Sequence, residues 1–537
     1  MKLYALWFLM EIIIFINYSP SYAFKCGTHL IKKKPFKIGN DKVNNNKRKL
    51  SNEFTPIQIK IDYTLLSTQI SSSNLNFYKE IFSDITNYFN SLLSVQHIDV
   101  DIDETMINEY CDIDKIGNGV ERWLYDNDLI IFPYIDYTYD EEVLAAASAC
   151  LVLNDYKPKG GIVGINNNFS NNKRDSKPFM EMLLMHELSH VLAFHPVFFD
   201  SLNLMITEEI DGNNYTFINS PKVIEKAKIH FNCSEIKGIQ LEDQGGEGSV
   251  GAHWEARYML GDYMISSDYT EIVISDITLA LFEDTGFYKV NYYTGGLFRF
   301  GKNQGCSFLN EKCIKSEDNS VMTSFPNDFC IKSGKYFCGS SHISRGQCRM
   351  TQYGEDIEKK YQYFNNSRIG GLFISADYCP TSYLTLTNYI FNDYYYPDHC
   401  SYGYPLYSSN GEIIGRNSLC FESSLIPLNE AGSPNEKSIC YEIECDKFKK
   451  NIIVTIGTLK VVCPRNRETL SNPDGFKGEI VCPDYNLVCS SEIPCNNMLD
   501  CIEKKSTAIR STYVYLFDYS LNNNFYFIYL MLILYLL

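Results

Sequence analysis

The sequence predicts an α+β protein of several domains, with an α/β N-terminal part, a mixed central part and a disulfide-rich C-terminal part dominated by loops. Its 537 residues exceed what a single hydrophobic core usually holds. Strand and helix patterns alternate through roughly the first 200 residues, which is typical of α/β domains. Fifteen of the 19 cysteines follow residue 305, a density that indicates a disulfide-stapled, loop-rich domain.

Three folded segments follow from these patterns: residues 53–196, residues 197–305 and residues 306–505. In the first, "PIQIKIDYTLL" alternates apolar and polar residues as a strand does. The stretch "NFYKEIFSDITNYFNSLLSV" then has helical periodicity, and "DLIIFPYI" and "GGIVGIN" indicate further strands. A helix that starts near Pro178 carries "HELSH" and closes this α/β domain. We expect residues 197–305 to form a central domain and residues 306–505 a Cys-rich one.

Composition limits the classes of function. The formal net charge of −17 argues against nucleic acid as a partner and indicates a soluble acidic surface. Nineteen cysteines are hard to keep as inert thiols in the cytosol, so they favour an exported protein. Four N-x-S/T sequons beyond residue 23 are compatible with glycosylation of an exported chain. Their asparagines are Asn168, Asn214, Asn232 and Asn365.

The N-terminal end predicts export. Residues 1–23 have the pattern of a signal peptide, with Lys2 before an apolar run and the small-residue sequence "SYA" ending at Ala23. Because Glu11 interrupts the apolar run, an uncleaved anchor is the alternative. Residues 24–52 are polar and basic, which indicates a propeptide.

Residues 506–537 are expected to be a C-terminal hydrophobic anchor signal. The final 13 residues, "FYFIYLMLILYLL", are apolar but short for a membrane span of about 20 residues. A short apolar tail after a polar stretch is typical of a GPI-attachment signal. The candidate attachment residues are Ser506, Thr507, Ala508, Ser511 and Thr512. A plain terminal anchor and a buried terminal strand are the alternatives, and the cell surface is the expected location.

The stretch "MHELSHVLAFHP", residues 185–196, indicates a metal site. His186 and His190 are four residues apart, so a helix places both on one face. A catalytic zinc ion needs at least one more protein ligand and keeps an open position for water. Glu187 could accept a proton from zinc-bound water and pass it to the leaving amine. The alternative is an amphipathic helix whose two histidines have structural roles alone.

Three residues are candidates for the third ligand. His195 would lie on the far side of the helix, which Pro196 tends to end. Glu209 follows His190 by 19 residues, a spacing that suits a glutamate ligand on a second helix, but "DGNN" after it indicates a turn. His253, in "GAHWEARYML", precedes Met264 by 11 residues, and Met264 lies in a turn-like setting. A methionine turn beneath three histidines is typical of metzincins.

With these residues in view, the chain resembles the leishmanolysin family of surface metalloproteases. "PIQIKIDYT", "TLALFEDTGFYKVNY", "GKNQGCSFL" and "ADYCP" are similar to the family's signature stretches. The resemblance implies a metzincin-type catalytic domain with one Zn²⁺ per chain. It also implies the roles of five residues: His186, His190 and His253 as zinc ligands, Glu187 as catalytic base and Met264 as the methionine turn.

Two further features come from the same resemblance. Ala193 stands where the family has glycine, so it must turn at negative φ or be strained. "FKCGTH" resembles the family's propeptide motif, in which a cysteine thiolate blocks the open zinc position. Cys26 would be this latency switch, and a disulfide at Cys26 is the alternative.

Cysteine parity then predicts two disulfides. Without Cys26, 18 cysteines remain, and 15 of them lie from Cys306 onward, an odd number that cannot close internally. We pair Cys111 with Cys150, which flank the α/β segment before the HELSH helix. Cys233 must then reach forward, and we pair it with Cys306. Fourteen cysteines are left for seven internal bridges.

The implied function is a zinc endopeptidase that cleaves extracellular proteins in extended conformation. "GGIVGIN" would be the edge strand that pairs with the substrate backbone. One alternative is a catalytically inactive adhesion or binding protein on the same fold, against which the intact histidines, Glu187 and Met264 argue. The other is a zinc hydrolase with Glu209 as third ligand.

Overall fold

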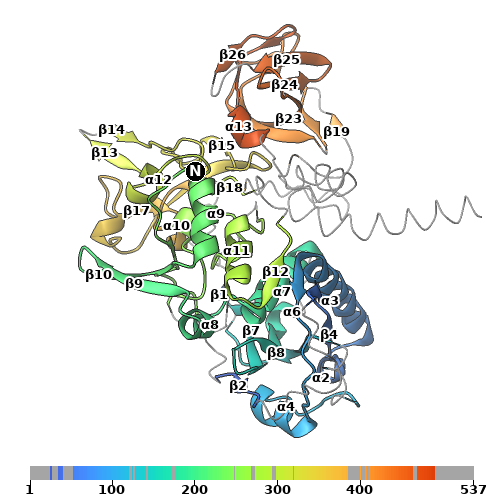
Figure 1. Ribbon diagram of the computed structural model, residues 1–537. Coiled ribbons are helices and arrows are strands. Elements are labelled where there is room, and N and C mark those ends of the chain that lie inside the picture. Colours follow the sequence, from blue (N-terminus) through green and yellow to red (C-terminus); the bar gives the residue numbers. More distant parts are fainter. Residues whose placement is uncertain are drawn as a thin grey trace, which may run out of the picture.

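The computed structural model describes most of the three folded segments. The described residues are 25–26, 34–39, 53–119, 124, 127–140, 143–170, 177–246, 248–267, 272–292, 298–317, 320–384, 400, 406–407, 411–415, 417–463 and 468–489. The expected signal peptide, most of the expected propeptide and the expected anchor signal lie outside them. The protein is a mixed α/β structure with several sheets (Figure 1).

The N-terminal part is built on a mixed sheet with the strand order β1-β7-β8-β6-β4. β4 and β6 run parallel, as do β6 and β8, whereas β7 is antiparallel to β8. The strands are β1 (Lys25–Cys26), β2 (Phe36–Lys37), β4 (Ile59–Ile61), β6 (Leu129–Asp136), β7 (Val143–Val152) and β8 (Pro158–Asn166). β7 and β8 are buried along almost their whole length, because helices and chain cover both faces of the sheet.

Helices pack on both faces of this sheet. α7 (Lys177–Leu192) contacts β7, β8 and α3 (Ser72–Leu92) on one face. α4 (Glu104–Cys111) contacts β7 and β8, and its buried residues share a small core with Ile130 and Phe132 of β6. Ile131, between these two, belongs to the main core with α7, since successive residues of a strand point to opposite faces. The short helices of this part are α2 (Thr64–Gln69) and α6 (Asn167–Ser170).

The prediction that "GGIVGIN" forms the substrate-binding edge strand is wrong, because β8 lies between β7 and β6. One glycine of this strand, Gly161, serves helix packing instead. A Cβ atom at Gly161 would lie 2.3 Å from Cγ1 of Val191 on α7. The strand on the outer side of β8 is β7, and β1 and β2 pair with it in parallel.

The central part continues the same hydrophobic core. α8 (Pro196–Ser201) is followed by a hairpin of β9 (Met205–Ile210) and β10 (Asn213–Ile218). The hairpin turns at Asp211 and Gly212, both at positive φ, as the "DGNN" sequence indicates. The other elements here are α9 (Pro221–Phe231), β11 (Ile239–Gln240), α10 (Ala256–Met259), α11 (Asp276–Asp284) and β12 (Tyr288–Val290). β12 returns to pair with β5 (Leu93–Val95), which also pairs with β3 (Thr55–Pro56).

The C-terminal part holds more regular structure than a loop-dominated domain would. In its described residues, an antiparallel sheet has the strand order β25-β24-β23-β21-β28-β26, and β23–β26 lie at the end of the molecule opposite α3 (Figure 1). The strands are β13 (Lys315–Glu317), β14 (Ser320–Met322), β15 (Tyr336–Cys338), β16 (Arg345–Gln352), β17 (Ile369–Gly371), β18 (Thr381–Leu384), β19 (Leu406–Tyr407), β20 (Ile413–Ile414), β21 (Ser418–Ser423), β22 (Ile426–Pro427), β23 (Lys437–Asp446), β24 (Asn451–Ile456), β25 (Leu459–Cys463), β26 (Thr469–Ser471), β27 (Phe476–Lys477) and β28 (Glu479–Val481). The short helices are α12 (Ser307–Asn310), η3 (Lys359–Tyr361), η4 (Ile374–Ala376) and α13 (Tyr485–Val488).

Eight disulfides join cysteines of the described residues. Cys111–Cys150 and Cys233–Cys306 confirm the two pairings that parity predicted. Six more lie within the C-terminal part: Cys313–Cys379, Cys330–Cys348, Cys338–Cys420, Cys400–Cys440, Cys445–Cys489 and Cys463–Cys482. The remaining cysteines of the predicted seventh bridge, Cys495 and Cys501, lie outside the described residues.

Removing the Cys233–Cys306 bridge is expected to lower the free energy of unfolding by on the order of 4 kcal/mol, because 73 residues separate its ends. The double variant Cys233→Ala/Cys306→Ala tests this by denaturant unfolding. Cys463→Ala/Cys482→Ala is the matched control, since a separation of 19 residues predicts a smaller loss. Equal losses in the two variants would contradict an effect that acts through chain entropy.

Candidate metal centre

The helix that carries "HELSH" is a core helix. From Leu183 to Leu192 every residue of α7 is buried, as expected for a helix enclosed on all sides. The helical stretch Phe179–Ser201 is long and apolar enough to cross a membrane, but 78% of its apolar window is buried inside the protein. The apolar composition of this stretch is therefore explained by its packing in the protein core.

The end of α7 is made without glycine. The Ser189 carbonyl accepts hydrogen bonds from the backbone N–H groups of Ala193 (2.9 Å) and Phe194 (2.8 Å). Ala193 is not among the described residues with positive φ. The chain therefore leaves the helix in a conformation that alanine adopts without strain, which is the first of the two outcomes expected for this position.

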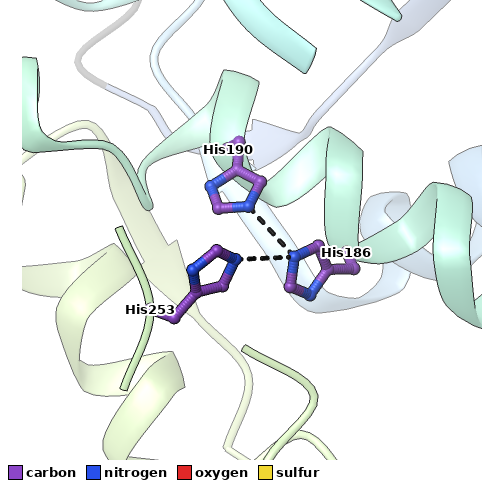
Figure 2. A group of neighbouring side chains, drawn as sticks. All are labelled: His186, His190 and His253. Carbon is purple, nitrogen blue, oxygen red and sulfur yellow. Dashed lines mark hydrogen bonds between the residues drawn. The ribbon is translucent and has the colours of Figure 1, made fainter. Parts of the chain in front are cut away.

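Three histidines meet at the C-terminal half of α7. His186 and His190 project from the helix, and His253 arrives from a distant segment and faces them (Figure 2). The Nε2 atom of His186 lies 3.0 Å from Nε2 of His190 and 3.2 Å from Nε2 of His253. A tetrahedral zinc ion with Zn–N bonds of 2.0–2.1 Å separates its ligand atoms by roughly 3.3 Å. The spacing therefore fits one zinc ion among the three rings.

Backbone carbonyls fix the tautomer of all three rings. Nδ1 of His186 lies 2.6 Å from the Tyr263 carbonyl, Nδ1 of His190 lies 2.6 Å from the Phe194 carbonyl, and Nδ1 of His253 lies 3.1 Å from the Ser249 carbonyl. Because a carbonyl oxygen only accepts hydrogen bonds, we infer that each Nδ1 carries the proton. The lone pair of each Nε2 atom is then directed toward the other two rings. Three converging lone pairs of this kind are suited to binding a metal cation.

Burial keeps the three imidazoles neutral. It lowers the pKa of His186 to about 4 and that of His253 to about 3. Burial also lowers the pKa of His190 well below its usual value, and the neighbouring histidines lower it further. Neutral rings are the form that binds a metal, so the site is ready for one near pH 7.

A short extended segment holds His253 in place. The His253 carbonyl accepts a hydrogen bond from the Glu242 N–H (2.9 Å), and the Trp254 N–H donates to the Met264 carbonyl (2.9 Å). Leu241 and Trp254 form an antiparallel bridge. The segment thus lies between residues 240–242 on one side and the turn at Met264 on the other.

A buried carboxylate shapes the turn at Met264. Oδ1 of Asp262 accepts a hydrogen bond from the Met264 N–H (2.8 Å), and Oδ2 accepts from the Ser275 N–H (3.1 Å) and the Thr278 hydroxyl (2.7 Å). The Trp254 indole in turn donates to Thr278 (2.7 Å). Burial raises the pKa of Asp262 to about 6, against the opposing effect of these hydrogen bonds. Met264 itself is fully buried.

Tyr263 connects this turn to α7 by two contacts. Its carbonyl faces Nδ1 of His186, and its hydroxyl lies 2.7 Å from the Ser189 hydroxyl. Tyr263 and Ser189 could not be recognised as parts of the site from the sequence, whereas Asp262 was expected only as part of the turn. The "GDYM" sequence suggested a turn, but the direction of a backbone carbonyl has no sequence signal.

Glu187 follows His186 on α7 and is fully buried. Its charge acts on the hydroxyl of Tyr139, whose pKa is raised first by burial and further by Tyr134, Asp136 and Glu187. Tyr139 is a further residue near the site that sequence reasoning did not find.

The other candidates lie elsewhere. His195 caps α8, and its Nδ1 accepts a hydrogen bond from the Val197 N–H (3.1 Å). Glu209 is exposed on the β9–β10 hairpin opposite Asn214, and it is not part of the histidine group. Cys26 lies in β1, opposite Ala145 of β7, and the structure describes its backbone alone.

An H-E-x-x-H helix, a third histidine from a distant segment and a turn with a buried methionine are together typical of zinc hydrolases, and the three histidines form a group that could hold a metal ion. Comparison with known proteins gives the family. The sequence profile of leishmanolysin matches residues 77–495, so the chain belongs to the leishmanolysin family of zinc-dependent metalloendopeptidases, as the resemblance predicted.

Curated relatives agree with this assignment. A leishmanolysin homolog of Crithidia fasciculata is 29% identical over 363 residues, which cover 65% of this chain and 53% of the relative. Leishmanolysin of Leishmania tropica is 26% identical over 404 residues, covering 72% and 59%. A leishmanolysin-like peptidase of Drosophila melanogaster is 28% identical over 303 residues, covering 51% and 44%. The chain thus spans about half the length of these relatives.

Proposed function

We propose that this protein is a zinc-dependent endopeptidase that hydrolyses peptide bonds of extracellular proteins, with one Zn²⁺ held by His186, His190 and His253. The observation that carries the proposal is the convergence of three Nε2 atoms, each on a ring oriented by a backbone carbonyl. Membership of a family of zinc-dependent endopeptidases supports it.

The reaction needs one base besides the metal. A bound zinc ion supplies Lewis acidity, which lowers the pKa of water at the open ligand position and polarises the scissile carbonyl. Glu187, one residue from His186 and buried, accepts the proton of the attacking water and passes it to the leaving amine. Met264 forms the floor beneath the histidines, and Tyr263 keeps the His186 ring in position.

The strand proposed to pair with substrate is β7. An extended peptide adds to an open sheet edge through main-chain hydrogen bonds. β7 has β8 on one side, and on its other side it pairs with β1 and β2, both from the expected propeptide. Removal of residues 24–52 would leave this side of β7 open to substrate.

Latency is proposed to combine this pairing with the thiolate of Cys26 at the open ligand position. Cys26→Ser is then expected to give a partly active precursor, because a serine hydroxyl stays protonated and is a much weaker ligand than a thiolate. The measurement is casein cleavage by the unprocessed chain, with and without a thiol-modifying reagent. If the Cys26→Ser precursor cleaves no more casein than the wild-type precursor does, the pairing of β1 and β2 with β7 is enough to inhibit the enzyme.

Export and surface attachment are part of the proposal. Eight disulfides among the described residues support an oxidising compartment. The sequon residues Asn168, Asn214, Asn232 and Asn365 are all exposed, which supports glycosylation. The hydrophobic tail of residues 506–537 is the proposed anchor, as a GPI signal or a plain terminal segment.

Metal removal and return test the proposed activity. Casein cleavage by the processed chain is expected to stop with 1,10-phenanthroline and to resume when zinc is restored. An inactive binding protein on the same fold would also take up zinc but would not cleave casein at any stage.

A further inference from the structure

A second group of metal-binding side chains lies directly behind His253. One carboxylate oxygen from each of Glu242, Asp243 and Glu255 comes within 4.8 Å of the others. Oxygen atoms on opposite sides of a Ca²⁺ ion are roughly 4.6–5.2 Å apart, given Ca–O distances of 2.3–2.6 Å. The spacing therefore leaves room for one such ion. The group has oxygen donors alone, which suits Ca²⁺ rather than zinc.

Two buried carboxylate oxygens of this group have no hydrogen-bond partner. Oε1 of Glu255 accepts a hydrogen bond from the Arg257 N–H (2.9 Å), but Oε2 has no partner although Glu255 is fully buried. Oδ1 of Asp243 is likewise buried and without a partner. A buried charged oxygen with no partner is costly, and a bound cation removes that cost.

The hydrogen-bond partners of Glu242 and Asp243 are also too few to compensate the charge of these carboxylates. The oxygens of Glu242 accept hydrogen bonds from the Gln244 N–H (2.9 Å) and the Ser266 hydroxyl (3.1 Å). Asp243 Oδ2 lies 3.5 Å from the Tyr361 hydroxyl. None of these neutral donors neutralises the carboxylates.

The surrounding charges leave an excess of negative charge. Asp377 is a fourth carboxylate that acts on Glu255, and it accepts a hydrogen bond from the Gln244 side chain (2.6 Å). Against the four stand Lys360, whose Nζ is 3.7 Å from Asp243 Oδ2, and Arg257. The Arg257 guanidinium donates through Nη2 to the backbone carbonyls of Phe308 and Glu311, and its buried Nη1 has no hydrogen-bond partner. With all four ionised, the carboxylates exceed the two cations by two charges, which matches one divalent cation. Burial opposes this ionisation, since it raises the pKa of each of the four carboxyls.

We propose that Glu242, Asp243 and Glu255 bind a Ca²⁺ ion that braces the segment carrying His253. Glu242 donates its backbone N–H to the His253 carbonyl, and Glu255 is two residues beyond His253. Asp377, from the C-terminal part, lies beside the group and continues it into that part of the chain. The side chain of Asp243 is 18% exposed, which gives the ion an entry path from solvent.

The test uses the full processed chain, loaded with zinc and dialysed against calcium-free buffer. About 5 mM Ca²⁺ is expected to raise the Tm of the wild type by on the order of 5 °C, with a smaller shift for Mg²⁺. Tb³⁺, a luminescent substitute for Ca²⁺, is expected to bind and emit on excitation of Tyr361. Glu255→Gln and Asp243→Asn should each weaken Tb³⁺ binding at least about tenfold, since each removes one anionic ligand.

Glu209→Gln is the matched control, because it removes an exposed carboxylate on the β9–β10 hairpin. It should respond to Ca²⁺ as the wild type does. The proposal is overturned if Ca²⁺ does not change the Tm of the wild type and Tb³⁺ bound to it does not emit. It is also overturned if Glu255→Gln and Asp243→Asn respond to both ions as the wild type does. If Glu255→Gln raises the Tm of a protein that ignores Ca²⁺, the carboxylates share a proton instead of a cation. These readouts need no proteolysis, so they stand apart from the proposed peptidase activity.

Discussion

Replacing Glu187 with alanine is expected to lower casein cleavage by at least about a hundredfold, because general-base catalysis usually contributes that much. Zinc content should stay near that of the wild type, because Glu187 is not one of the proposed zinc ligands. The rings of the three histidine ligands are oriented by backbone carbonyls and not by Glu187. Cleavage is measured on the processed chain, and zinc is measured on the same sample.

Glu187→Gln is the matched variant for this experiment. It keeps the size and burial of the side chain but cannot accept a proton, so it should be as inactive as Glu187→Ala. A loss in the alanine variant alone would point to disturbed packing of α7. Substantial cleavage by both variants would show that Glu187 is not the base.

Replacing His253 with alanine is expected to have the second large effect. Loss of one of three ligands should weaken zinc binding more than the roughly 10- to 100-fold typical of residues that orient ligands. Cleavage should fall with zinc occupancy. The comparison is zinc retained after dialysis and casein cleavage, each measured beside the wild type.

Two control variants separate His253 from the other candidates for third ligand. Glu209→Gln and His195→Ala should leave zinc and cleavage unchanged, because Glu209 is exposed on its hairpin and His195 caps α8. If Glu209→Gln strips the metal while His253→Ala keeps it, the glutamate-ligand hydrolase is the correct alternative.

The histidine group could be predicted from two sources: the local spacing of residues along a helix, and the resemblance to a known family. His186 and His190 share a helix face through their four-residue spacing, which depends on helix geometry alone. His253 was found through its "HWE" setting and the methionine that follows, so the resemblance supplied what spacing could not. For the Cys233–Cys306 bridge, parity required a partner of Cys233 from Cys306 onward, and Cys306 was the chosen partner, which the structure confirms.

The features that were missed depend on contacts between distant segments. An apolar run such as "GGIVGIN" fits an interior strand and an edge strand equally well, and Gly161 is explained by Val191 of α7, 30 residues later. The carbonyl of Tyr263 faces His186 across 77 residues of sequence. The carboxylates of Glu242, Glu255 and Asp377 come from three segments, and no spacing rule joins them.

We propose above all that His186, His190 and His253 hold one zinc ion. Anomalous X-ray diffraction at the zinc edge, from crystals of the processed chain, tests it most directly. The expected result is a single strong peak about 2.0–2.1 Å from the Nε2 atom of each of the three histidines. A zinc peak beside Glu209 in place of His253, or zinc bound elsewhere with none among the three histidines, would show that these three residues are not the zinc ligands.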